Sequence, residues 1–99
     1  MTALLEPDEI PPGAIIFWVI YDRPVDHPNA VVLRPQFSVY NVECPEHYGT
    51  VTNRIGRAVV IASPRVWICQ TVDEARALVP PGCHLMADNN PKIAEVWMQ

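Results

Sequence analysis

The apolar and polar positions of residues 66–82 change their period once, and this change predicts a strand followed by a short helix. Residues 66–71 alternate along an extended segment rich in β-branched and aromatic types, whereas apolar residues recur at helical spacing over residues 72–79. Thr71 and Glu74 have the spacing of a capping box, in which each side chain accepts a hydrogen bond from the other residue's backbone N–H. Pro80 stops the helix, which is so short that it needs a sheet to pack against.

The other apolar runs predict strands. The run at 14–21 is apolar on both faces, which is typical of a central strand, and Pro35 indicates an edge, a bulge or a break between two runs that could be one strand. The expected fold class is α+β, with one helix on one face of a mostly antiparallel sheet of roughly five to seven strands. The predicted strands cover residues 14–21, 30–33, 37–42, 58–62, 66–71, 83–87 and 93–98.

Two segments lack these patterns. Residues 1–13 are rich in proline, so we expect an extended or flexible arm before a single domain over residues 14–99. Residues 43–57 predict a long loop with a small hairpin around Thr50 to Asn53, and loops of this length are usually functional or mobile. No apolar run is long enough to span a bilayer, and the first residues lack the charge pattern of a signal peptide.

Composition favours a protein partner. Hydrophobic residues make up 49% and charged residues only 18% of the 99 residues, so part of the surface is expected to be apolar. The formal net charge is −4 without a basic cluster, which disfavours nucleic acid. The 3 cysteines follow no disulfide spacing and indicate free thiols in a reducing cytoplasm. The 4 glycines stand apart, so we expect no phosphate-binding loop and no cofactor.

A proline-stiffened loop follows the first predicted strand and carries Asp22, Asp26 and His27. Two carboxylates and an imidazole on one loop could bind a metal ion or act as general acid and base. The plainer interpretation is that the aspartates hydrogen-bond within their own turns and the histidine is solvated. The catalytic interpretation requires these side chains to converge in space.

Cys44 and His47 have the C-x-x-H spacing of a pair of zinc ligands. Cys83 and His84 could supply a further ligand, although neighbouring residues on a strand point to opposite faces. A Cys–His nucleophile pair is a second chemical interpretation, and no family signature surrounds either cysteine. The plainer interpretation is a free cysteine in a loop and a small buried cysteine in a strand.

All 3 tryptophans fall in predicted strands. We expect Trp18 and Trp67 in the core, because their strands are apolar on both faces. Trp97 lies on the last strand, which could form a sheet edge where an exposed aromatic side chain favours binding. The expected interface residues are therefore Trp97, Val96 and Ile93.

Three blocks of the sequence resemble a group of small bacterial proteins of unknown function. The blocks have the patterns YDxPxDxP over Tyr21–Pro28, TxxEARALVPPG over Thr71–Gly82 and PxIxEVW over Pro91–Trp97. The resemblance covers about half the chain and leaves out residues 1–13 and 36–65. It implies a bacterial cytosolic setting and carries no activity and no site residues.

The sequence favours a small non-enzymatic protein-interaction module that forms a homodimer through a sheet edge or an open sheet face. The alternative is a small metal-dependent or acid–base enzyme built on the loop after the first strand. A third hypothesis is a nucleic-acid binder that uses Arg54, Arg57 and Arg65, and the acidic net charge argues against it.

Overall fold

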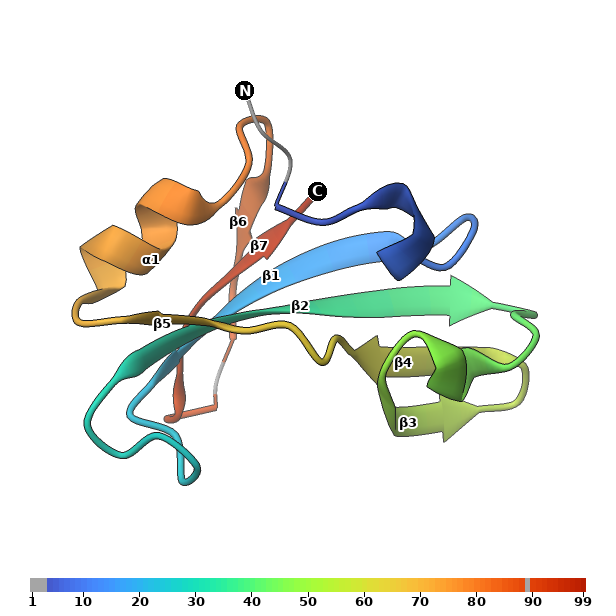
Figure 1. Cartoon of the computed structure of the whole chain (residues 1–99), viewed down its shortest axis with the longest axis horizontal. Coiled ribbons are helices and arrows are strands. Elements are labelled where there is room, and N and C mark those ends of the chain that lie inside the picture. Colours follow the sequence, from blue (N-terminus) through green and yellow to red (C-terminus); the bar gives the residue numbers. More distant parts are fainter. Residues whose placement is uncertain (1–3, 89) are drawn as a thin grey trace.

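The computed structural model describes residues 4–88 and 90–99, which form a seven-stranded antiparallel sheet with one α-helix. The strand order is β3-β4-β2-β1-β7-β6, and β5 also pairs with β2. The predicted antiparallel sheet with a single helix is confirmed for this part of the chain (Figure 1). The elements are η1 (Pro7–Glu9), β1 (Ile15–Asp22), β2 (Val31–Tyr40), η2 (Pro45–His47), β3 (Thr50–Ile55), β4 (Ala58–Ala62), β5 (Trp67–Cys69), α1 (Val72–Leu78), β6 (His84–Met86) and β7 (Ile93–Met98).

β1 and β2 are the long central strands, and both carry buried apolar residues on each face. Trp18 stands opposite Pro35, and Ile20 stands opposite Leu33. Ile20, Leu33 and Phe37 are each 0% exposed, as large apolar residues are on the covered face of a sheet. The first predicted strand is therefore confirmed as central, because β1 lies between β2 and β7.

Pro35 lies inside one continuous strand, so the apolar runs on either side of it are both parts of β2. On one side of β2 the partner changes from β5, which pairs as far as Leu33, to β4, which pairs from Gln36 onward. Pro35, which has no backbone N–H, therefore lies between the β5 and β4 ladders. Its carbonyl accepts a hydrogen bond from the Ser63 N–H at 3.0 Å. The ladder is interrupted as predicted, but the strand does not break because β1 pairs along the other side.

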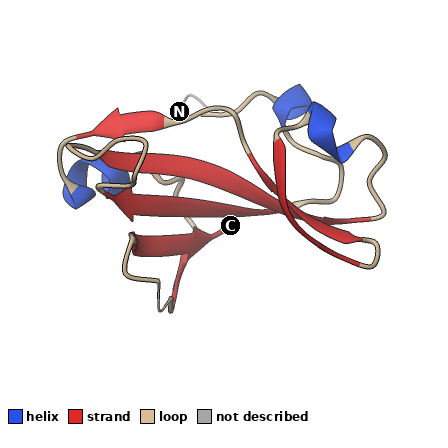
Figure 2. Cartoon of the chain, turned by 90° about the horizontal axis from the view of Figure 1, so that it is seen from below, coloured by secondary structure: helices blue, strands red, loops and turns tan. Residues whose placement is uncertain are grey.

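The helix α1 begins at the predicted cap and lies at one end of the long strands (Figure 2). The Thr71 hydroxyl accepts a hydrogen bond from the Glu74 N–H at 3.1 Å, whereas Glu74 accepts one from the Gln70 N–H at 3.0 Å rather than from Thr71. The helix ends at Leu78, slightly before the predicted end, because the residue before a proline favours extended geometry. Ala75 is 0% exposed, and α1 contacts β5, β1 and β2.

Residues 4–13 differ from the predicted extended or flexible arm. They include the turn η1 and pack against the sheet, where Leu5 is 6% exposed and Pro11 is fully buried. The Glu9 carboxylate also receives a hydrogen bond from the Arg65 guanidinium at 3.0 Å. Apolar burial and this ion pair hold the segment on the domain, while residues 1–3 of the predicted arm lie outside the described residues.

Residues 43–57 contain the turn η2 and the whole of β3, so the prediction of a long loop with a small hairpin is wrong in extent. β3 pairs with β4, and most of its side chains are exposed. A strand that buries neither face shows no alternation of apolar and polar residues. Its sequence is therefore hard to distinguish from that of a loop.

The prediction that residues 93–98 form a sheet edge is wrong, because β7 lies between β1 and β6. The chain continues through the β6–β7 hairpin, so β6 takes the outer position that the sequence assigned to the last strand. The two ends of the strand order are β3 and β6, and β5, which among the described residues pairs with β2 alone, has a free edge as well. β5 is also less buried than predicted, since Ile68 is 55% exposed.

Candidate functional site

The outer strand β6 combines a free backbone edge with exposed apolar side chains. Within the described residues it pairs with β7 alone. All 3 residues of β6 are exposed, including Leu85 at 57% and Met86 at 39%. Such a strand can extend its sheet onto another strand, because its outward N–H and C=O groups are not used in its own sheet.

A row of cross-strand neighbours connects Leu85 to the core. Leu85 stands opposite Trp97 on β7, and Trp97 stands opposite Trp18 on β1. Directly opposed residues point to the same face of a sheet, with their Cβ atoms about 4.5–5.5 Å apart. Exposure rises along this row from 2% at Trp18 to 57% at Leu85. The apolar row therefore ends at the outer strand, where a further strand would continue it.

The opposite outer strand, β3, has features that block pairing. Its register with β4 shifts between Val51 and Asn53, which marks a bulge, and Arg54 is exposed at the edge. Bulges and charged side chains are the common means by which edge strands avoid pairing with other chains. β6 has neither feature among its residues, so the two outer strands of the sheet differ in their capacity to pair.

The Glu95 carboxylate ties β7 to the helix and orients Trp97. It accepts two hydrogen bonds from the Arg76 guanidinium, at 2.9 and 2.6 Å, and one from the Trp97 indole N–H at 3.0 Å. The hydrogen bonds from Arg76 hold the pKa of Glu95 below its usual range, against the desolvation that raises it. The indole beside Leu85 is therefore held in one orientation by the protein itself.

The predicted interface residues lie one strand inside the edge. Trp97 and Val96 are partly buried and stand opposite Leu85 and Met86, while Ile93 stands opposite β1 beside a shift in register. Sequence reasoning missed Leu85 and Met86 because a three-residue strand gives a weak pattern. The absence of charge and proline within β6 is the signal that could have indicated an unprotected edge.

The loop after β1 brings Asp26, His27 and Arg34 near one another at the surface. The Asp26 carboxylate lies 3.9 Å from the Nε2 atom of His27 and 3.9 Å from the Nη2 atom of Arg34. Both distances exceed the reach of direct proton transfer through a hydrogen bond. Asp22 is exposed at the end of β1, and among the described residues its carboxylate forms no ion pair with His27. This geometry is that of weak surface ion pairs.

Cys44 and His47 are exposed at the turn η2, where the His47 N–H donates to the Cys44 carbonyl at 2.9 Å. η2 contacts β3 and β4, whereas Cys83 and His84 lie at the start of β6, the other outer strand (Figure 1). The structure therefore does not bring the two Cys–His pairs together. Across residues 4–88 and 90–99, no group of three His, Cys, Asp or Glu side chains could hold a metal ion.

The three arginines considered for nucleic acid do not form one basic surface. Arg65 pairs with Glu9 and lies over the Trp67 ring, with its guanidinium carbon 5.3 Å from the ring centroid. Arg54 and Arg57 are exposed in the β3–β4 hairpin. One of the three charges is thus neutralised locally.

Comparisons with family models, with curated proteins and with solved structures give no match. No helix within the described ranges is long and apolar enough to cross a membrane. The outer strand β6 is the most distinctive surface of the described chain.

Proposed function

We propose that the protein is a non-enzymatic interaction module in which β6 pairs with β6 of a second copy. The observation that carries this proposal is the unprotected edge of β6, with Leu85 and Met86 exposed on a strand that pairs only with β7 in the described chain. The bulge and Arg54 protect β3. β5 also pairs with one strand only in the described chain, but it packs against the helix α1, so β6 is the outer strand that fits pairing. No cofactor takes part in this function.

A two-fold axis through Leu85 would pair the two strands antiparallel and join the two sheets into one. In this register Leu85 faces Leu85 of the second copy, and His84 faces Met86 of the second copy. The row from Trp18 through Trp97 to Leu85 would then continue across the axis into the second core. The second copy is the favoured partner because it supplies the same apolar row at the same register.

The proposed association is weak and reversible. β6 has 3 residues, so the contact provides few backbone hydrogen bonds and a small buried area. Interfaces of this size belong to transient complexes, for which we expect a Kd of about 1–100 μM. The association therefore depends on protein concentration.

The proposed setting is the cytoplasm of a bacterium. Cys44, Cys69 and Cys83 are all free, which fits a reducing compartment. The resemblance of three sequence blocks to small bacterial proteins supports the same setting, and the described helices give no reason to invoke a membrane partner.

Sedimentation velocity over about 1 μM to 1 mM tests the proposal, because this range brackets the expected Kd. We expect the weight-average mass to rise from 11.1 kDa toward twice that value. Hydrogen exchange at the two ends of this range should show slower exchange in β6 at high concentration, with little change in β3. A monomer throughout the range, or protection confined to β3, would refute the proposal.

A further inference from the structure

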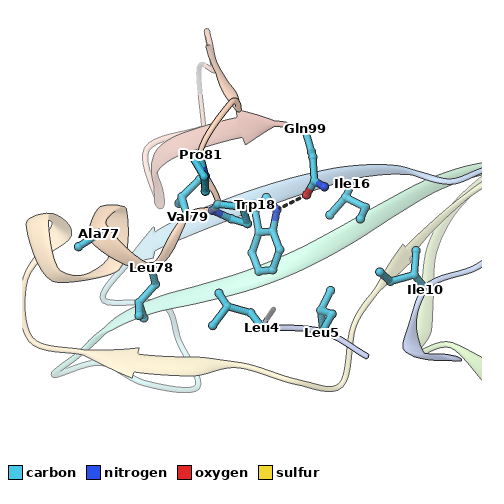
Figure 3. A pocket seen from close by; sticks show the side chains of 11 residues that line it. Leu4, Leu5, Ile10, Ile16, Trp18, Ala77, Leu78, Val79, Pro81 and Gln99 are labelled. Atoms are coloured by element: carbon cyan, nitrogen blue, oxygen red, sulfur yellow. Dashed lines mark hydrogen bonds between the residues drawn. The ribbon is translucent and has the colours of Figure 1, made fainter. Parts of the chain in front are cut away.

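An apolar pocket lies between the C-terminal end of α1 and the N-terminal segment (Figure 3). Its volume is about 540 Å³. Small-molecule sites usually measure about 300–1,000 Å³ and are lined mainly by apolar side chains. Figure 3 shows Trp18 between two walls, one from the helix end and the following prolines, the other from the N-terminal leucines. The apolar walls include Leu4, Leu5, Trp18, Leu78 and Pro81.

Among the described residues, the lining of the pocket includes no charged side chain and one polar side chain, that of Gln99. The Trp18 indole N–H donates a hydrogen bond to the Gln99 Oε1 atom at 3.1 Å. Because an indole can only donate, this bond fixes which end of the amide is oxygen and leaves the Nε2 group as a donor beside the pocket. The Gln99 backbone N–H donates to the Ile16 carbonyl at 2.9 Å, which anchors the residue to β1.

We propose that this pocket binds an uncharged, mainly aliphatic small molecule that carries one hydrogen-bond acceptor. The apolar walls take the aliphatic part, and the Gln99 amide N–H donates to the acceptor. A carboxylate would lose hydration without meeting a positively charged side chain among the described lining residues, which disfavours a carboxylate ligand. Leu78 is 36% exposed and Gln99 is exposed, so the ligand enters from solvent without unfolding of the domain.

Isothermal titration calorimetry with 1-decanol tests the proposal, and decanoate is the matched charged probe. We expect saturable binding of 1-decanol by the whole chain, with one ligand per chain. Decanoate should bind at least about tenfold more weakly at neutral pH, because its charge is desolvated without a partner. The proposal is overturned by an absence of saturable 1-decanol binding, or by decanoate binding as tightly as the alcohol.

Two variants test the two parts of the pocket. Ala77 lines the pocket from α1, so Ala77→Phe should fill it and abolish 1-decanol binding. Ala94→Phe, at an exposed position outside the lining, is the control and should leave the affinity unchanged. Gln99→Glu keeps the acceptor for the Trp18 indole but replaces the amide donor with a charge, so it should weaken binding at least about tenfold. Unchanged affinity in either pocket variant would contradict the assigned site.

Discussion

Leu85→Lys is expected to dissociate the proposed dimer and leave the fold of each chain intact. Leu85 is 57% exposed, so the substitution removes little packing within one chain. In the proposed dimer the two lysines would face each other across the two-fold axis, and like charges directly opposite on paired strands are destabilising. The substitution also places at this edge the residue that natural edge strands often use to prevent pairing.

The size of the effect follows from the exposed area of Leu85. Complete burial of a leucine side chain contributes about 1.5–3 kcal/mol, so burial of the 57% that is exposed contributes roughly 0.9–1.7 kcal/mol per copy. Two copies give roughly 1.7–3.4 kcal/mol, and about 1.4 kcal/mol corresponds to a tenfold change in Kd. Leu85→Lys should therefore raise the dimer Kd by about 15- to 300-fold, before charge repulsion is counted.

Sedimentation velocity on the wild type and on two lysine variants measures this change. Ile55→Lys is the matched control, because Ile55 is a 74% exposed aliphatic residue on the other outer strand, β3. We expect it to leave the Kd within about threefold of the wild-type value, as a surface change outside an interface does. Circular dichroism should show the same secondary structure for all three proteins. Equal weakening by both lysines, or a normal dimer from Leu85→Lys, would refute the pairing of β6.

Three further predictions concern the monomer. Gly49→Ala should lower the free energy of unfolding, measured by urea titration, by about 3 kcal/mol or more. At Gly49 φ is +153°, and the new Cβ would lie 2.1 Å from the Ala62 carbonyl oxygen of β4. Gly56→Ala is the control: φ is +59° and the space is open, so the substitution should cost only about 1 kcal/mol. Hydrogen bonds from Arg76 lower the pKa of Glu95 in the folded state. The stability that this pair contributes is therefore complete above the usual pKa of 4.5 and is lost as the pH falls through the lower pKa of the folded state. Glu95→Gln should make the urea midpoint decline less steeply between about pH 6 and pH 3. The exposed thiol of Cys44 should react with an aromatic disulfide reagent before the thiols of Cys69 and Cys83, because burial raises the pKa of both. Faster labelling of Cys69 or Cys83 would contradict the structure.

The buried elements of the fold could be predicted from the sequence because burial leaves a periodic pattern. The central strand β1, the short strand β4 and the cap of α1 all follow from apolar spacing and from the Thr71 to Glu74 spacing. β3 was missed because both of its faces are largely exposed. The packing of residues 4–13 was missed because prolines indicate a break in regular structure without excluding burial, and Pro11 is fully buried.

The candidate site depends on strand order, which the sequence does not encode locally. Trp97 was correctly placed on a strand, but that strand is not the edge, because whether β6 or β7 is outermost depends on which of them pairs with β1. β7 pairs with β1 because the apolar residue Trp97 of β7 continues the row that begins at Trp18. The shorter β6 then keeps the free edge, which transfers the expected interface from Trp97 to Leu85.

The difference between the two outer strands also explains why the proposed assembly should stop at two copies. A sheet with two open edges could add further copies without limit, which leads to fibres. Pairing of β6 with itself uses the same surface on both copies, so the two-fold axis closes that edge completely. The ends of the joined strand order are then the two β3 strands, where the bulge and Arg54 oppose further pairing. β5, which within the described ranges also pairs with one strand only, packs against the helix α1. An Arg54→Val variant should therefore form species larger than a dimer at high concentration, but only while Leu85 is present. If Arg54→Val forms dimers and nothing larger, the bulge alone is enough to prevent pairing of β3. Species larger than a dimer from the Arg54→Val, Leu85→Lys double variant would contradict the assignment of β6 as the first edge to pair.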